Sequence, residues 1–241
     1  MSVINLPVQP PFITGSVLSP LAEYPDVLLL DVRFDEAHFH ASLFEILKIP
    51  LPVRLQKAVN KRRAEYLASR YCLQQAMNTL GITQFVLHND ENRAPLWPAG
   101  LRGSLSHTHR RLCALLTRRQ DLLPGIDCEQ IMGGAHASDM AHMIINSAER
   151  ALLAALELPF SCALTVIFSA KESLYKAIWP EIRRFIDFSA AEVVGWDVKQ
   201  ARLTLRLTRT LSVAFCAGKT FTVAVDLQPE TVLTWVIGQQ K

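Results

Sequence analysis

The chain combines two patterns of hydrophobic and polar positions, and each predicts a different kind of element. In residues 202–207, polar and apolar side chains alternate with a period of two, which is typical of a half-buried β-strand. Short apolar runs between turn-forming residues predict further strands at residues 27–32, 103–106, 112–117, 122–129, 221–227 and 232–237. The last part of the chain is therefore expected to be rich in strands.

Helical spacing appears between these runs. Residues 54–80 repeat apolar side chains every three to four positions, and Gly81 marks the expected end of that helix. Asn146 and Glu149 have the spacing of a capping box before the apolar run 151–158, which predicts a helix start there. Helices mixed with antiparallel strands indicate an α+β fold.

The predicted elements fall into two similar groups, which suggests two halves in one chain. We place the boundary near residues 118–121, giving an N-terminal half of residues 1–119 and a C-terminal half of residues 120–241. A length of 241 residues suits one or two compact domains, and half of the residues are hydrophobic. The chain can therefore bury a sizeable core.

The composition also predicts a compartment. Charged residues interrupt every apolar stretch well before the ~18 residues that a spanning helix needs, so no transmembrane span is expected. The first residues lack a basic region before an apolar one, which argues against a secretory signal. The five cysteines are odd in number and widely spaced, as expected for buried thiols in a reducing cytoplasm. We expect a cytoplasmic protein.

Positive charge is concentrated in one segment. The net charge of the chain is only +3, but residues 54–119 hold twelve Lys and Arg against three acids, a net of +9. Such a segment suits a polyanionic ligand or an acidic partner, and a solvated basic surface explains it equally well.

The first motif with chemical potential is Gly125-Ile126-Asp127-Cys128-Glu129. On a strand, Asp127 and Glu129 project to one side while Ile126 and Cys128 face the core. Two adjacent carboxylates repel unless a cation lies between them, and hard oxygen ligands suit Mg²⁺. On spacing alone, two solvated acids on an exposed strand face are the simpler interpretation.

The second motif is the segment from Ser169 to Lys176. Ser169 and Glu172 have capping-box spacing, which predicts a helix start there and an end at Pro180. Glu172 and Lys176 lie four apart and share a helix face. The acid could complete a metal site while the lysine neutralises a phosphate, but a cap and a surface ion pair explain both residues equally well.

The third motif joins Arg93-Ala94-Pro95 to Gly103-Ser104-Leu105-Ser106-His107. Ser104 and Ser106 share one face of a short strand, His107 follows at its end, and a nearby arginine completes a plausible anion cradle. A Ser–His nucleophile pair is not expected, because adjacent strand residues point apart.

The fourth motif, residues 61–70, places Arg63 and Arg70 two turns apart on a predicted helix face, where both could reach one ligand. A solvated basic helix end is the simpler interpretation of this pair.

In order along the chain, R-x-E-x-L-A-S-R, R-x-P-L-W-P, G-S-L-S-H, G-I-D-C-E and F-S-A-K-E-S-L-Y-K closely resemble the 4′-phosphopantetheinyl transferase family, in particular its enterobactin-synthase branch. The resemblance covers residues 61–179. It implies two related α+β halves with a pseudo-twofold relation and an active site in the cleft between them. The implied reaction moves 4′-phosphopantetheine from coenzyme A to a serine of an acidic apo carrier protein (acyl, peptidyl or aryl), releasing adenosine 3′,5′-bisphosphate.

The resemblance also implies roles for individual residues. Asp127, Glu129 and Glu172 match Mg²⁺ ligands, and Glu172 or a metal-bound water would help to deprotonate the serine. Lys176 and Lys171 match lysines that contact the diphosphate. Positions matching those that hold the nucleotide end, particularly its 3′-phosphate, are Arg63, Arg70, Arg93, Pro95, Ser106 and His107. Cys128 departs from the family, which has an aliphatic residue there.

The pathway implied is siderophore or other secondary-metabolite synthesis by a monomeric enzyme that binds no nucleic acid. The competing hypothesis is a non-enzymatic basic module that binds RNA or another polyanion. Such a module needs aromatic side chains interleaved with its basic residues, and only Tyr66, Tyr71 and Trp97 lie near them.

Overall fold

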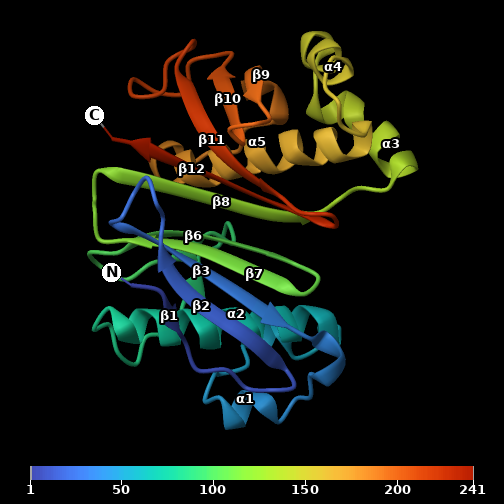
Figure 1. Cartoon of the computed structure of the whole chain (residues 1–241). Coiled ribbons are helices and arrows are strands. Elements are labelled where there is room, and N and C mark those ends of the chain that lie inside the picture. Colours follow the sequence, from blue (N-terminus) through green and yellow to red (C-terminus); the bar gives the residue numbers. More distant parts are fainter. Residues whose placement is uncertain (1, 241) are drawn as a thin grey trace. The chain divides into compact units, whose positions relative to one another are not determined.

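The computed structural model describes residues 2–240, and the chain divides into two compact units, unit 1 (Met1–Gln120) and unit 2 (Asp121–Lys241). Each unit contains one five-stranded sheet and one long helix, visible in Figure 1 as α2 and α5. All described strand pairs in both sheets are antiparallel. The predicted α+β class is therefore confirmed.

Unit 1 holds a sheet with the strand order β1-β2-β3-β7-β6 and a separate two-stranded ribbon. Its strands are β1 (Ile4–Asn5), β2 (Ile13–Pro20), β3 (Val27–Phe34), β4 (His88–Asn89), β5 (Pro95–Leu96), β6 (Arg102–Thr108) and β7 (Arg111–Thr117). Its helices are α1 (Leu43–Ile46), α2 (Asn60–Thr79) and the short 3₁₀ turns at Glu36–His38 and Val53–Leu55. Helix α2 packs on the sheet through an apolar face that is fully buried, including Leu67, Ala68 and Leu73.

Helix α2 is shorter than the sequence predicts. The prediction of a helix from Arg54 is wrong at its start, because Val59 has an extended backbone (φ −60°, ψ 152°) and separates the 3₁₀ turn from α2. The predicted end is correct. Gly81 follows the last turn with φ +75°, a left-handed conformation that glycine adopts without steric cost.

Unit 2 holds a sheet with the strand order β8-β12-β11-β10-β9. Its strands are β8 (Leu122–Gln130), β9 (Ala191–Asp197), β10 (Arg202–Leu207), β11 (Thr220–Leu227) and β12 (Thr231–Gln239). Its helices are α3 (Gly134–Ile144), α4 (Ser147–Ala154), α5 (Phe160–Ile182) and the 3₁₀ turn η3 (Phe188–Ala190). Helix α5 packs along β8 and β12, and α3 packs on α5. The strands expected in this part of the sequence are all present.

The two predicted capping boxes have different outcomes. Asn146 caps α4, its side chain accepting the Glu149 N–H while the Glu149 carboxylate accepts the Asn146 N–H, so this prediction is confirmed. The second prediction is wrong, because α5 begins at Phe160 and Ser169 lies in its middle. Ser169 does not act as a cap, and its Oγ instead lies 2.9 Å from Thr234 Oγ1 on β12.

The predicted end of this helix at Pro180 is also wrong. Pro180 lies inside the last turn, and the helix continues to Ile182 before Arg183 takes a left-handed conformation with φ +46°. A proline so close to the end disturbs few backbone hydrogen bonds, so the helix tolerates it.

Two remaining expectations concern membranes and thiols. Among residues 2–240, no helix is long and apolar enough to cross a bilayer. All five cysteines are free, and Cys72, Cys113 and Cys128 are buried as predicted. Cys162 is half-buried and Cys216 is exposed, so the prediction of five buried thiols is wrong for these two.

Candidate functional site

Unit 2 brings the acids of two sequence motifs, Asp127 and Glu129 on β8 and Glu172 on α5, to the junction of these two elements. At Gly125 the two elements touch so closely that an added Cβ would lie 2.0 Å from the carbonyl oxygen of Ser173. Only glycine fits this crossing point. Strand alternation places Asp127 and Glu129 on the same face of β8 as Gly125, so both carboxyl groups lie on the side of α5.

Asp127 and Lys176 form the central contact of this acid cluster, which we define as Asp127, Glu129, Glu172 and Lys176. The Lys176 Nζ donates to Asp127 Oδ1 at 2.6 Å, and Asp127 is only 2% exposed. The simpler interpretation of Asp127 as a solvated surface acid is therefore wrong, and Lys176 forms an ion pair that reaches from α5 to β8.

The electrostatics show that the other two acids belong to the same cluster. Burial and then the nearby charge of Asp127 raise the pKa of Glu129 to about 7, although Lys176 acts in the opposite direction. Burial and Asp127 also raise the pKa of Glu172. Burial acts to lower the pKa of Lys176, but the charge of Asp127 and its hydrogen bond outweigh it, so that pKa is raised. Three carboxylates against one ammonium leave excess negative charge.

The donor set of this cluster fits a hard divalent cation that binds together with a phosphate ligand. All three candidate ligands are carboxylates, which is the oxygen chemistry that Mg²⁺ prefers. Within residues 2–240, no three His, Cys, Asp or Glu side chains form a ready-made metal group. Mg²⁺ is ordinarily held by one or two carboxylates plus substrate phosphates and water, so a complete protein cage is not required.

Lys171, the other lysine expected to contact the diphosphate, lies in a separate buried ion pair. Its Nζ contacts Glu149 Oε1 at 2.8 Å and donates to the carbonyl oxygens of Ile144 at 2.7 Å and Phe188 at 3.2 Å. The side chains of Lys171 and Glu149 are 4% and 2% exposed. Burial lowers the pKa of Lys171, and Glu149 opposes this effect. The ammonium is fully occupied by unit 2 itself.

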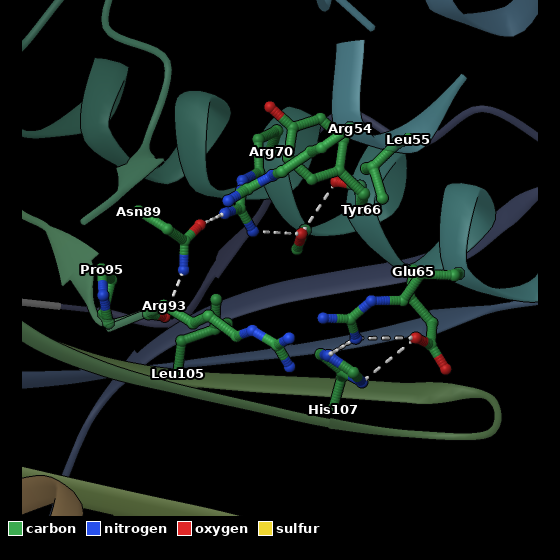
Figure 2. Close-up of a pocket in the computed structure, with 12 residues that line it drawn as sticks. Arg54, Leu55, Glu65, Tyr66, Arg70, Asn89, Arg93, Pro95, Leu105 and His107 are labelled. Carbon is green, nitrogen blue, oxygen red and sulfur yellow. Dashed lines mark hydrogen bonds and ion pairs between the residues drawn. The ribbon is translucent and has the colours of Figure 1, made fainter. Parts of the chain in front are cut away.

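Unit 1 contains the second candidate site, a cavity of about 410 Å³ that we call the arginine pocket (Figure 2). It lies beside α2, β6 and the turn between β4 and β5. Its lining residues are Arg54, Leu55, Arg62, Glu65, Tyr66, Ser69, Arg70, Asn89, Arg93, Pro95, Leu105 and His107. The structure therefore brings together four of the expected nucleotide-binding residues, Arg70, Arg93, Pro95 and His107.

Arg70 is the best-anchored cation of the arginine pocket. It is 5% exposed, and its guanidinium donates to Leu87 O at 3.0 Å, to Ser69 Oγ at 2.9 Å and to the Asn89 side-chain oxygen. Its Cζ lies 4.5 Å from the centre of the Tyr66 ring. Burial lowers the pKa of Arg70, but a guanidinium remains protonated at neutral pH.

Asn89 connects Arg70 to the turn that presents Arg93. The Asn89 amide donates to the carbonyl oxygen of Arg93 at 2.5 Å, and Arg93 itself has a left-handed backbone with φ +65°. The Arg93 N–H bonds to the Asp90 carbonyl at 3.0 Å, which closes the turn. In Figure 2 the Arg93 side chain extends into the same pocket as His107.

His107 lies between a base and an acid. Its Nε2 is 3.4 Å from Arg62 Nη1, and its Nδ1 is 3.7 Å from Glu65 Oε2. Arg62 also donates to Glu65 at 3.4 Å. The two ring nitrogens of His107 therefore face a guanidinium on one side and a carboxylate on the other.

Two expected residues lie outside the lining of the arginine pocket. His107 is part of β6 and does not follow its end, so Ser106 points to the opposite face of the strand, where it is 7% exposed. Arg63 lies over the Phe39 ring, with its Cζ 5.8 Å from the ring centre, while its neighbour Arg62 reaches the pocket. The side chains of Ser106 and Arg63 are therefore not among those that the pocket brings together.

Sequence analysis missed several lining residues of this pocket. Arg62, Glu65, Tyr66 and Ser69 repeat at three- and four-residue intervals, which is the spacing of one helix face. This signal was available, but the spacing of seven between Arg63 and Arg70 obscured it. No periodic signal pointed to Asn89, which lies in the two-residue strand β4, or to Arg54, which lies in the 3₁₀ turn Val53–Leu55.

Family models match parts of both units of the chain. Residues 51–117 match the model of the 4′-phosphopantetheinyl transferase N-terminal domain, and residues 124–226 match that of the 4′-phosphopantetheinyl transferase superfamily. The first matched range includes all lining residues of the arginine pocket, and the second includes the whole acid cluster.

Curated relatives give the same result. The chain is 42% identical over 174 residues to enterobactin synthase component D of Salmonella typhi, covering 72% of this chain and 71% of the relative. It is 37% identical over 169 residues to the protein of that name from Escherichia coli K12, covering 70% and 78%. It is 29% identical over 168 residues to the 4′-phosphopantetheinyl transferase PptT of Mycobacterium tuberculosis, covering 61% and 68%.

These matches decide against the alternative of a non-enzymatic basic module, and they agree with the resemblance of the five sequence motifs. The chain belongs to the 4′-phosphopantetheinyl transferase superfamily and is an enzyme of that class.

Proposed function

We propose that this transferase moves 4′-phosphopantetheine from coenzyme A to a serine of an apo carrier protein in a Mg²⁺-dependent reaction, and releases adenosine 3′,5′-bisphosphate. The observation that supports it most is the acid cluster, in which three carboxylates and one lysine from two elements meet within electrostatic reach. The reaction breaks a diphosphate, so a cluster that attracts both a cation and a phosphate is what the chemistry requires.

In this proposal each residue of the acid cluster has a defined task. Asp127, Glu129 and Glu172 hold Mg²⁺, and Lys176 offers its ammonium to the diphosphate beside Asp127. The metal, when bound, would stabilise the negative charge that develops on the diphosphate oxygens. Glu172 accepts the proton of the carrier serine as its oxygen bonds to phosphorus and the bond to the leaving nucleotide breaks.

The arginine pocket binds the nucleotide end of coenzyme A. Arg70, Arg93 and His107 contact the 3′-phosphate, Pro95 lines the pocket beside them, and Arg62 joins the set because it reaches the same cavity. Four arginines against one glutamate give this pocket an excess positive charge, which suits a phosphate monoester. The side chains of Arg63, Ser106 and Lys171 are not part of this proposal.

The physiological carrier belongs to siderophore or related secondary-metabolite synthesis. Two of the relatives described above are named enterobactin synthase component D, which supports that pathway class. An acidic carrier surface would complement the basic segment of residues 54–119.

The test is incubation of the chain with coenzyme A, Mg²⁺ and a panel of apo carrier proteins, read by intact mass. We expect one phosphopantetheine added to a carrier, and none to the same carrier with its acceptor serine replaced by alanine. A metal chelator should abolish the addition. Unchanged carrier masses throughout a panel that includes siderophore, polyketide and fatty-acid carriers would contradict the proposal.

A further inference from the structure

Three hydroxyl groups meet in the interior of unit 2 without any role in the site described so far. Ser169 and Ser173 lie on α5, Thr234 lies on β12, and all three residues are 0% exposed. Ser169 Oγ is 2.9 Å and Ser173 Oγ 2.7 Å from Thr234 Oγ1, and Ser173 Oγ donates to the Thr234 carbonyl at 2.9 Å. We call these three residues the hydroxyl clamp.

The distances define a chain of hydrogen bonds in which each of the three hydroxyl groups donates its proton to an acceptor. Ser173 gives its proton to the Thr234 carbonyl, so Thr234 Oγ1 must be the donor to Ser173. Thr234 then has no second proton for Ser169, so Ser169 donates to Thr234. Buried hydroxyls are expensive to leave unpaired, and here all three donors are satisfied.

The hydroxyl clamp lies at the level of the acid cluster. Thr234 is the cross-strand partner of Asp127 in the pairing of β12 with β8. On α5, Ser169 and Ser173 are four residues apart, and each precedes an acid-cluster residue, Glu172 or Lys176, by three positions. One end of the clamp is therefore fixed beside Asp127, and the other is fixed on the helix that carries Glu172 and Lys176.

The apolar contacts of α5 in this region set its distance from the sheet better than they set its register. Ala170, Leu174 and Ala177 pack by apolar contact, which is not directional, and Gly125 admits the helix backbone close to β8. Hydrogen bonds have narrow distance and angle limits, so the clamp restricts both rotation and sliding of α5.

We propose that the hydroxyl clamp is a positioning device for catalysis, in which Thr234 holds α5 in the register that brings Glu172 and Lys176 to Asp127. This inference rests on the proposed function of the acid cluster. Thr234 is a positioning residue that does not touch the substrate. A shift of about 1 Å in a catalytic group can cost about 100-fold in rate, so a device that holds helix register has a large effect on turnover.

The experiment compares Thr234→Val with Thr234→Ser. Valine keeps the shape and β-branching of threonine and removes the hydroxyl, and the freed serine hydroxyls can turn to carbonyls of their own helix, so the variant should fold. We expect Thr234→Val to lower kcat about 10-fold or more, with the KM for coenzyme A within about 2-fold of wild type. Thr234→Ser restores the hydroxyl and should recover most of the lost turnover.

Thr165→Val is the matched control. Thr165 is also 0% exposed on α5, and its hydroxyl donates to Ser161 O and accepts the Met132 N–H, about two turns before the acid cluster. This variant loses a buried hydroxyl of the same helix and should keep its kcat at temperatures where it is folded. A purely stabilising role predicts the same behaviour for both valine variants.

A second readout is Mg²⁺ binding to the complex with coenzyme A, measured by titration calorimetry. Thr234→Val should weaken it several-fold, while Thr165→Val leaves it unchanged. Wild-type kcat and Mg²⁺ affinity in folded Thr234→Val, or equal losses in Thr165→Val, would overturn the inference. A wild-type chain that modifies no carrier overturns the proposed function instead, and the calorimetric comparison then still tests the clamp.

Discussion

The arginine pocket of unit 1 and the acid cluster of unit 2 are both sites in which side chains of one charge outnumber those of the other. The pocket has four arginines and one glutamate among its lining residues. The acid cluster has three carboxylates and one lysine. In the proposed function the two sites therefore bind ligands of opposite sign, an anion in unit 1 and a cation in unit 2.

The partners of the central residues explain how such charge is tolerated. The acceptors that bind the Arg70 guanidinium are neutral: a carbonyl, a hydroxyl and a side-chain amide, with the face of Tyr66 beside them. They hold the side chain in place without cancelling its charge. In the acid cluster, burial and then repulsion from Asp127 raise the pKa values of Glu129 and Glu172, while Lys176 acts against both shifts.

The Lys171–Glu149 pair is the opposite case, although Lys171 is adjacent to Glu172 in the sequence. One cation meets one anion, both are buried, and the Glu149 carboxylate also accepts the N–H groups of Asn146 and Val193. This balanced pair has no capacity left for a ligand. The comparison teaches that excess charge, not burial or charge alone, distinguishes the candidate sites from structural ion pairs.

The largest effect should come from breaking the balanced pair. Lys171→Met leaves the Glu149 carboxylate buried without its cation, and removing one partner of a buried pair costs about 3–5 kcal/mol. We expect the free energy of unfolding, measured in urea, to fall by that amount. The double variant Lys171→Met with Glu149→Gln is the control and should recover part of the loss, because no buried charge remains. A loss below about 1 kcal/mol in the single variant would show that this pair is not structurally important.

Asp127→Asn should affect turnover far more than stability. It removes one of three mutually repelling charges, so we expect a small change in the urea midpoint together with a fall in kcat of about 100-fold or more. Glu192→Gln, which removes a charge paired with Arg206 elsewhere in unit 2, is the matched control and should keep kcat. Near-normal turnover of Asp127→Asn at saturating Mg²⁺ would contradict the role of the acid cluster.

The acid cluster and the arginine pocket were predictable to different extents. Strand periodicity alone placed Asp127 and Glu129 on one face, because a period of two leaves no ambiguity in the direction of a side chain. Glu172 joins them only because of the way α5 crosses β8. The local sequence pattern does not contain this crossing, so the prediction for Glu172 came from the family resemblance. The same locality explains the false helix start at Ser169, since a serine that binds Thr234 across 65 residues looks like a cap in the sequence.

The errors in unit 1 have a different cause. A helix with few apolar residues at its start leaves the rotation of its first turn undetermined, so Arg62 and Arg63 could not be distinguished. The structure distinguishes them by what each side chain meets, the arginine pocket for Arg62 and the Phe39 ring for Arg63. Which of two neighbouring arginines binds the ligand is therefore a tertiary property.

Within the arginine pocket, the buried Arg70 should contribute most to recognition of the 3′-phosphate. Arg70→Lys keeps one charge but loses the planar set of donors that binds a phosphate oxygen while anchored to Leu87 and Asn89. A charge-assisted hydrogen bond contributes about 1.5–3 kcal/mol, so we expect the KM for coenzyme A to rise roughly 10- to 150-fold. Comparison with dephospho-coenzyme A is the control, because the recognised group is absent there. An equal loss with both donors would show that Arg70 does not bind the 3′-phosphate.

The smallest effect should separate the two neighbouring arginines at the start of α2. The Arg62 side chain is 54% exposed, so solvent screens its charge and its loss should cost at most about 1 kcal/mol, or about 5-fold in the KM for coenzyme A. Arg63→Ala removes the same charge one residue away, outside the pocket lining, and should change that KM less than Arg62→Ala does. Because the screened contact weakens with salt, the difference between the two variants should shrink as ionic strength rises. Steady-state kinetics of both variants at low and high salt measure this directly. A larger effect from Arg63→Ala at low salt would mean that α2 presents Arg63 to the ligand, as the spacing of Arg63 and Arg70 in the sequence first indicated.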